Sequence, residues 1–128
     1  MPERDISFCH PVLQDAWKKS SAEYAKRYPN ASQPFLTTTY RSDEEQAKLY
    51  AKGRTAAGKI VTQIKSGGKH NKMPAEAYDV GFRKADGKAD WSGVNFRNMA
   101  VITKQVAPRV KWGGDWTGGF VDLPHYEI

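Results

Sequence analysis

Four polar residues in this chain have the types and spacing of a hydrolytic metal site. His70 and Asp79 lie in the string H-N-K-M-P-A-E-A-Y-D-V, and Asp122 and His125 lie in F-V-D-L-P-H-Y-E-I. Two imidazoles and one carboxylate are a common ligand set for a catalytic zinc, with a fourth position left for water. A further carboxylate shortly before the last histidine can act as general base toward that water. The pattern therefore predicts a zinc hydrolase.

Each of these residues also has a structural interpretation. Asp79 lies in the apolar stretch A-Y-D-V-G-F, where a carboxylate is costly to bury without a partner. It could accept backbone hydrogen bonds or pair with an arginine. His70 could be an exposed histidine in a basic loop, and Asp122 could brace a turn at residues 123–124. In an extended segment Asp122 and His125 would project toward opposite faces, so only such a turn could bring both to one metal.

Several strings, taken in order, resemble one family of zinc metallopeptidases. K-H-N is followed by P-A-E-A-Y-D, the C-terminal string is D-L-P-H-Y-E-I, and T-T-T-Y-R-S lies upstream and contains Arg41. The family includes D-alanyl-D-alanine carboxypeptidases, D-alanyl-D-alanine dipeptidases and L-alanyl-D-glutamate endopeptidases. The resemblance is closest to its phage endolysin branch, and it extends from about Thr37 to Ile128.

The resemblance implies a role for each residue of the motif. His70, Asp79 and His125 correspond to the zinc ligands. Asp122 corresponds to the base that deprotonates the attacking water and later donates the proton to the leaving amine. Arg41 corresponds to a residue that stabilises the oxyanion of the tetrahedral intermediate. Without the family, Arg41 would more often be a surface salt-bridge partner.

Two features depart from the family pattern. The separation of His70 and Asp79 is nine residues, longer than in the compact form of the motif, and the insert around Pro74 resembles the longer phage variant. Gly68 lies two positions before the histidine, where the family usually has serine. This second departure affects a supporting polar contact and leaves the ligands in place.

The resemblance also implies a substrate and a setting. It indicates a monomeric L-alanyl-D-glutamate peptidase that acts on the stem peptide of bacterial peptidoglycan. As an endolysin it would be made in the host cytoplasm and reach the cell wall in the periplasm after release by a holin. A D-alanyl-D-alanine carboxypeptidase or dipeptidase with the same metal site is the alternative enzyme. A catalytically inactive wall-binding module is the alternative from another class, and the retained ligands, base and arginine argue against it.

Length and composition predict one domain over residues 1–128, which the resemblance identifies as a peptidase domain. The net charge of +6 favours an anionic partner, such as nucleic acid, a membrane or a cell wall. No nucleic-acid motif accompanies the scattered Lys and Arg residues, so we expect no nucleic-acid partner. No stretch approaches the roughly 20 apolar residues of a transmembrane helix, and no signal peptide is visible. The single cysteine, Cys9, suits a reducing compartment.

The elements that position these residues form an α+β pattern. Periodicity, capping residues and breakers predict helices over residues 11–28, 42–53 and 92–106, with Ser42 and Ser92 as N-caps of the second and third. Strands are expected at 34–40, 77–82, 110–112 and 125–128, with a possible short strand at 59–62. We therefore expect a single small domain with helices packed on a mostly antiparallel sheet, like the hedgehog/D-Ala-D-Ala peptidase fold of the resembled family. The glycine-rich loop 54–72 delivers His70 and is expected to be functional.

Further polar and aromatic residues are candidates for the walls of the site. Gln46, one helical turn beyond Arg41, could line the same cleft, although polar helix faces are usually only solvated. Trp112, Asp115 and Trp116, in the string W-G-G-D-W, are expected at the floor and rim of the site. Core packing is an equally good expectation for Trp112.

Overall fold

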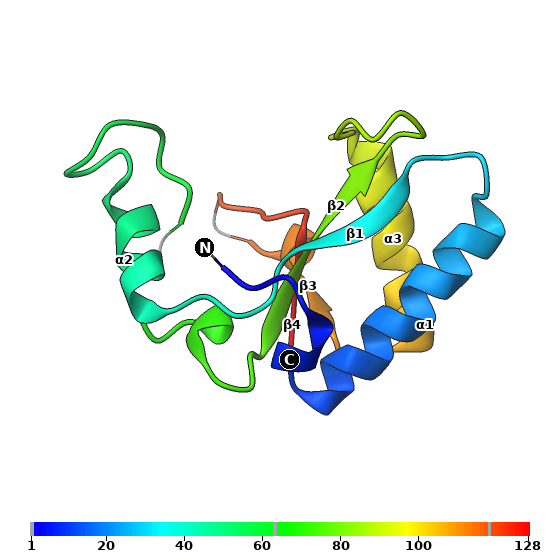
Figure 1. Cartoon of the computed structure of the whole chain (residues 1–128), viewed down its shortest axis with the longest axis horizontal. Coiled ribbons are helices and arrows are strands. Elements are labelled where there is room, and N and C mark those ends of the chain that lie inside the picture. The colour runs from blue at the N-terminus through cyan, green and yellow to red at the C-terminus, as the bar shows by residue number, and fades with distance from the viewer. Residues whose placement is uncertain (1, 63, 118) are drawn as a thin grey trace.

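A central antiparallel sheet separates a helical side from a side formed by loops and one short helix. The computed structural model describes residues 2–62, 64–117 and 119–128. Within these ranges the sheet has four strands in the order β1-β2-β4-β3. Figure 1 shows α1 and α3 together on one side of the molecule and α2 on the opposite side. The elements are α1 (Pro11–Arg27), β1 (Gln33–Thr38), α2 (Asp43–Ala51), β2 (Ala77–Arg83), α3 (Gly93–Val106), β3 (Lys111–Trp112) and β4 (His125–Glu127), with short 3-10 turns η1 (Ile6–Phe8), η2 (Lys69–Asn71) and η3 (Gly113–Asp115).

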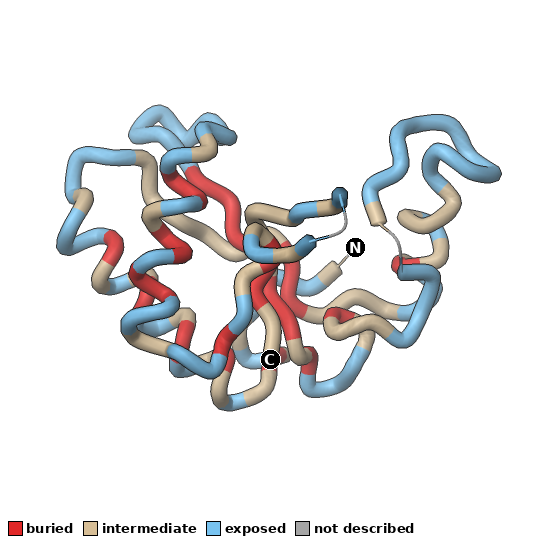
Figure 2. The backbone as a smooth tube through the Cα atoms, turned by 180° about the vertical axis from the view of Figure 1, so that it is seen from behind, coloured by how far each residue is buried: buried red, intermediate tan, exposed pale blue. Residues whose placement is uncertain are grey.

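The hydrophobic core lies between the sheet and the pair α1 and α3. Alternate residues of β2, Tyr78, Val80 and Phe82, are completely buried in it. The rings of Tyr78 and Tyr126 stack with their centroids 5.5 Å apart. Because successive side chains of a strand point to opposite faces, this arrangement turns Asp79 away from the core. Figure 2 shows the buried residues concentrated in this part of the molecule, whereas the chain around α2 is mostly exposed.

The ends of the helices follow from the residues that cap them. Pro11 occupies the first turn of α1, and the Nδ1 atom of His10 accepts a hydrogen bond from the backbone NH of Val12 at 3.1 Å. The predicted capping box of Ser42 and Glu45 is present at the start of α2. Ser92 occupies the N-cap position of α3, but its side chain makes no capping hydrogen bond. Its hydroxyl instead donates to Asp90 at 2.7 Å. The expected N-cap position is therefore correct, but the expected capping hydrogen bond is absent.

The expected fold class is confirmed, and one expected strand is wrong. Residues 59–62 are irregular, and Ile60 and Val61 within them are 49% and 47% exposed. This segment lies outside the sheet, where its backbone finds no strand to pair with among the described residues. The other predicted elements form within a few residues of their expected bounds. In the described part of the chain, no helix has the length and apolar character needed to cross a membrane.

Candidate metal centre

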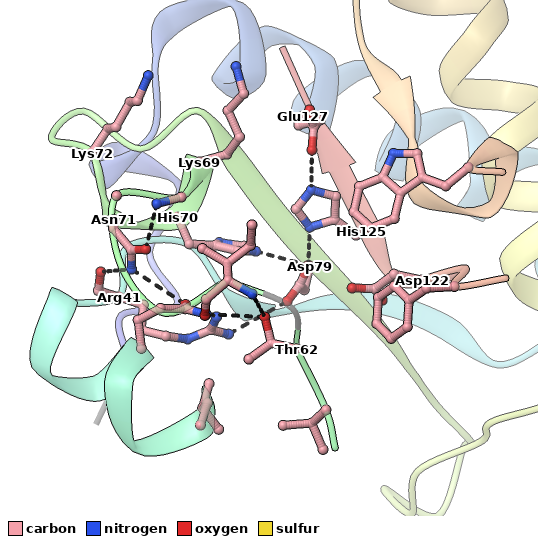
Figure 3. A pocket seen from close by; sticks show the side chains of 18 of the residues that line it. Arg41, Thr62, Lys69, His70, Asn71, Lys72, Asp79, Asp122, His125 and Glu127 are labelled. Atoms are coloured by element: carbon pink, nitrogen blue, oxygen red, sulfur yellow. Dashed lines mark hydrogen bonds and ion pairs between the residues drawn. The ribbon is translucent and has the colours of Figure 1, made fainter. Parts of the chain in front are cut away.

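The structure brings His70, Asp79 and His125 together on the non-core face of the sheet. Oδ1 of Asp79 lies 3.1 Å from Nε2 of His70 and 3.1 Å from Nδ1 of His125. Asp79 and His125 are direct neighbours across the β2–β4 ladder, whereas His70 arrives from η2. One atom from each residue could hold a metal ion, and these atoms all lie within 4.8 Å of one another. The predicted trio is therefore assembled from three separate segments (Figure 3).

The remaining nitrogen of each imidazole is held by an acceptor. Nδ1 of His70 lies 2.8 Å from the backbone carbonyl of Thr39, and Nε2 of His125 lies 2.8 Å from Oε1 of Glu127. A carbonyl or a carboxylate can only accept, so these nitrogens carry the hydrogen. When the hydrogen on these nitrogens is the only one on each ring, the nitrogen that faces Asp79 has the free lone pair that a metal would bind. Such outer contacts orient histidine ligands in metal sites.

Glu127 is a functional candidate that the sequence analysis missed. It lies two residues beyond His125 on β4, and residues i and i+2 of a strand share a face. The string H-Y-E on a predicted strand was the available signal. Figure 3 shows the imidazole of His125 between the carboxylates of Glu127 and Asp79.

The turn that carries His70 is tied to the segment that carries Arg41. The backbone NH of Arg41 donates to the carbonyl of His70 at 2.9 Å. The side-chain amide of Asn71 donates to the carbonyl of Arg41 at 2.8 Å and accepts from the NH of Gly68 at 2.9 Å. The backbone of Arg41 is therefore fixed relative to the metal-ligand candidate His70.

The guanidinium of Arg41 points toward Asp79. Its Nη2 lies 3.9 Å from Oδ2 of Asp79, and its Nη1 donates to Oε1 of Gln46 at 2.8 Å. The side chain is 13% exposed, so the charge is held in a partly desolvated position beside the site. The structural alternative for Asp79, a pairing with an arginine, is thus present together with the two histidines.

The turn between Asp122 and His125 forms as expected. The NH of His125 donates to the carbonyl of Asp122 at 3.1 Å, and the NH of Asp122 donates to the carbonyl of Gly113 at 3.1 Å. A Cβ atom at position 113 would collide with the carbonyl oxygen of Asp122, so glycine is required for this close approach. Both carboxylate and imidazole then line the same cleft.

Trp112 supports this turn and packs against the core, whereas Asp115 pairs with α3. The indole NH of Trp112 donates to the carbonyl of Leu123 at 2.7 Å, and Asp115 pairs with Lys104 of α3 at 2.7 Å. Neither residue is among the described residues that line the cleft, so the expectation that they form its floor and rim is wrong. Trp116 does line the cleft, with its ring centroid 5.0 Å from that of His125.

The pKa values of Asp79, His125 and Asp122 differ from their ordinary values. Burial opposes ionisation of Asp79, but His70 and His125 outweigh it and hold its pKa far below the usual range. Burial lowers the pKa of His125, but hydrogen bonds with Asp79 and Glu127 outweigh this and raise it to about 9. Burial, followed by repulsion from Asp79, raises the pKa of Asp122 above its ordinary value. The site thus contains one firmly ionised carboxylate and one whose proton affinity is increased.

A cleft of about 810 Å³ runs over these residues. Leu49, Val61 and Ile64 form an aliphatic wall on one side. Trp116 and Phe120, stacked with centroids 6.3 Å apart, form an aromatic wall on the other. Loop 54–72 contributes Val61 and Ile64 of the aliphatic wall together with His70, in line with its expected functional character.

Cys9 and His10 lie apart from this site. The Cys9 thiol is buried against the carbonyl of Ala77 at 3.5 Å, and burial raises its pKa to about 12. His10 caps α1. A buried thiol of this kind is not a nucleophile at neutral pH.

Comparisons with known proteins place this architecture in one family. No family model matches the sequence. The chain is 30% identical over 129 residues to the peptidoglycan L-alanyl-D-glutamate endopeptidase CwlK of Bacillus subtilis, covering 93% of this chain and 72% of that protein. Its fold matches the L-Ala D-Glu endopeptidase ChiX of Serratia marcescens with a TM-score of 0.71 at 22% identity, over 96% of this chain and 82% of that one. With its cleft and its His-Asp-His cluster, this chain therefore belongs to the family of peptidoglycan endopeptidases that contains CwlK.

Proposed function

We propose that this chain is a zinc-dependent endopeptidase that hydrolyses the L-alanyl-D-glutamate bond in the stem peptide of bacterial peptidoglycan. The convergence of His70, Asp79 and His125 in the cleft carries this proposal. The choice of bond is supported by the relative that is named for it. The net charge of +6 suits approach to an anionic cell envelope.

The donor atoms of the cluster fit zinc. Two imidazole nitrogens and a carboxylate oxygen are a known catalytic ligand set, and the cluster contains no softer thiolate among its described members. Thr39 and Glu127 hold the two rings so that Nε2 of His70 and Nδ1 of His125 face Asp79. When bound, zinc would polarise the scissile carbonyl and lower the pKa of the attacking water.

Asp122 and Arg41 supply the remaining chemistry in this proposal. Asp122 takes the proton from the attacking water and donates it to the leaving amine. Its raised pKa suits both steps, because a base with a pKa nearer neutrality accepts and returns a proton more readily. Arg41 presents a fixed positive charge beside Asp79, where it stabilises the negative charge that develops on the carbonyl oxygen.

We further propose that the protein acts as a monomeric endolysin. Its motifs resemble the phage branch of the family most closely. It would be synthesised in the host cytoplasm and would reach peptidoglycan after a holin opens the membrane. Expression in a Gram-negative bacterium tests this: lysis should require a co-expressed holin, and lysis without one would contradict the proposed route.

The bond that is cleaved can be identified directly. Purified muropeptides digested with the zinc-loaded protein should yield fragments with a new N-terminal D-glutamate, detected by mass spectrometry. Release of free D-alanine instead would identify a carboxypeptidase, and wall binding without any new amino group would identify an inactive module.

Asp122→Asn separates the base from the ligands. The variant should bind zinc as the unmutated protein does, but its turnover should fall by about a hundredfold to ten-thousandfold, as loss of a general base typically causes. Metal analysis and kinetics on the same sample check this. Loss of zinc from the folded variant would make Asp122 a ligand.

A further inference from the structure

Gln46 is a buried polar residue that the proposed mechanism does not use. Among the described residues of α2 it is the one that is buried, with 3% of its surface exposed. The helix thus turns an amide, in place of an apolar side chain, toward the rest of the protein. A buried amide is unfavourable unless protein hydrogen bonds replace those to water. Its partners therefore show what it holds in place.

The amide of Gln46 joins two parts of the cleft. Its Oε1 accepts from Nη1 of Arg41 at 2.8 Å. Its Nε2 donates to the backbone carbonyl of Ile64 at 2.7 Å and to the hydroxyl of Thr62 at 3.2 Å. The orientation of the amide follows from chemistry, because a guanidinium can only donate and a carbonyl can only accept.

These contacts give the oxygen and the nitrogen of Gln46 different tasks. The backbone of Arg41 is already fixed by His70 and Asn71, so the shorter contact with Gln46 and the longer one with Asp79 orient its guanidinium. The nitrogen fastens the irregular segment that presents Ile64 to the cleft, a segment without strand pairing in the described structure. The oxygen and both amide hydrogens have partners within the protein, so the amide is committed to these contacts.

We propose that Gln46 is a positioning residue with two separable functions. Its oxygen orients the Arg41 guanidinium for the transition state, and its nitrogen holds Thr62 and Ile64, so that Ile64 stays in the aliphatic wall that binds substrate. This inference rests on the oxyanion role proposed for Arg41. The inference predicts that loss of the Gln46 Oε1 contact with Arg41 lowers kcat. Loss of the Gln46 Nε2 contacts with Ile64 and Thr62 should instead raise KM.

A double-mutant cycle tests whether Gln46 acts through Arg41. The variants are Gln46→Met, which keeps the length of the side chain without its hydrogen bonds, Arg41→Ala, and the combination. With a soluble stem peptide containing L-alanyl-D-glutamate, Gln46→Met should lower kcat roughly tenfold to a hundredfold, the usual effect of losing a hydrogen bond to a charged group. In the Arg41→Ala background the same change should leave kcat almost unaltered but still raise KM. Gln105→Met, on the exposed side of α3, is the matched control and should change neither.

Gln46→Glu separates the two functions of the amide. A carboxylate can still accept from Arg41 but cannot donate to the Ile64 carbonyl, so this variant should recover much of kcat while KM stays raised. Equal losses of kcat with and without Arg41 would overturn the inference, as would unchanged kinetics in Gln46→Met. If Gln46→Met fails to fold or to bind zinc, the test rests on Gln46→Glu. An unchanged KM in that variant is then enough to overturn the inference about Gln46. Failure of the unmutated protein to cleave the peptide would instead refute the proposed function.

Discussion

The two sides of the sheet are built in different ways. On the side of α1 and α3, residues such as Leu13, Tyr24 and Met99 are completely buried and hold the fold by apolar packing. On the side of the cleft, α2 and the loops are held by polar contacts, and the buried residue of α2 is Gln46. Strand β2 serves both sides, because Tyr78 and Val80 face the core while Asp79 faces the cleft. This division predicts that folding stability and activity can be altered separately.

Removal of a ligand candidate should have the largest effect. His70→Ala takes away one of three donor atoms and should reduce zinc content and peptidase activity to background. The fold should remain, because the core on the other side of the sheet is untouched. Metal analysis, near-UV circular dichroism and an amino-group assay check this. Full activity in a zinc-free sample would contradict the assignment of His70 as a metal ligand. It would also contradict the view that the cleft side of the sheet carries the activity.

A core substitution should have the opposite pattern. Leu13 is 0% exposed on α1, and Leu13→Ala should lower the free energy of unfolding by about 2–5 kcal/mol, through lost burial and the cavity left behind. At a temperature where the variant is still folded, kcat and zinc content should match those of the unmutated protein. Urea unfolding followed by kinetics at low temperature measures both quantities. A parallel fall in kcat would show that the two sides are coupled.

Loss of the outer contact to His125 should have an intermediate effect on the cleft side alone. Glu127→Ala removes the acceptor of the Nε2 hydrogen and should weaken zinc binding by roughly 10- to 100-fold, as is typical of outer-shell substitutions. Glu127→Gln keeps an acceptor oxygen and should lose less. Competition with a chelator of known affinity measures the change. Equal losses in both variants would indicate that the charge, and not the hydrogen bond, is what matters.

Over a single pH unit, the change in zinc affinity with pH should be the smallest of these effects. The pKa of His125 is raised from 6.5 to about 9 in the metal-free protein, so near neutral pH its imidazole holds a proton that zinc must displace. Zinc affinity should therefore rise by roughly tenfold per pH unit up to that pKa, with about one proton released. The stabilisation that protonated His125 gives the metal-free protein is fully present below pH 6.5 and is lost as pH rises through about 9.

Calorimetry in buffers of different ionisation enthalpy measures the proton release, and thermal unfolding of the metal-free protein measures the stability. The two quantities should change with pH in opposite directions. Zinc affinity independent of pH between 7 and 8.5 would contradict the raised pKa of His125. In Glu127→Ala the pKa of His125 should be lower, because one of the hydrogen bonds that raise it is lost. The core residues should be unaffected by this change.

The sequence by itself determined the helices, most of the strands and the residues of the cluster. Periodicity and capping residues are local properties, so α1 and the capping box of α2 follow from neighbouring positions. The turn at Leu123–Pro124 was likewise foreseen, because Asp122 and His125 could not otherwise face the same side. The strand proposed at residues 59–62 failed because pairing depends on a partner that a local pattern does not contain.

Only the tertiary structure decided how the cleft is supported. Glu127 reaches His125, Trp112 braces Leu123, and Gln46 joins Arg41 to Ile64. Gln46 and Ile64 are 18 residues apart, and Asp79 and His125 are 46 residues apart. Contacts at such separations depend on strand register and loop path, which no short window of sequence specifies. From the sequence, Gln46 could line the cleft or be solvated like most polar residues of a helix, and only the fold shows that it is buried.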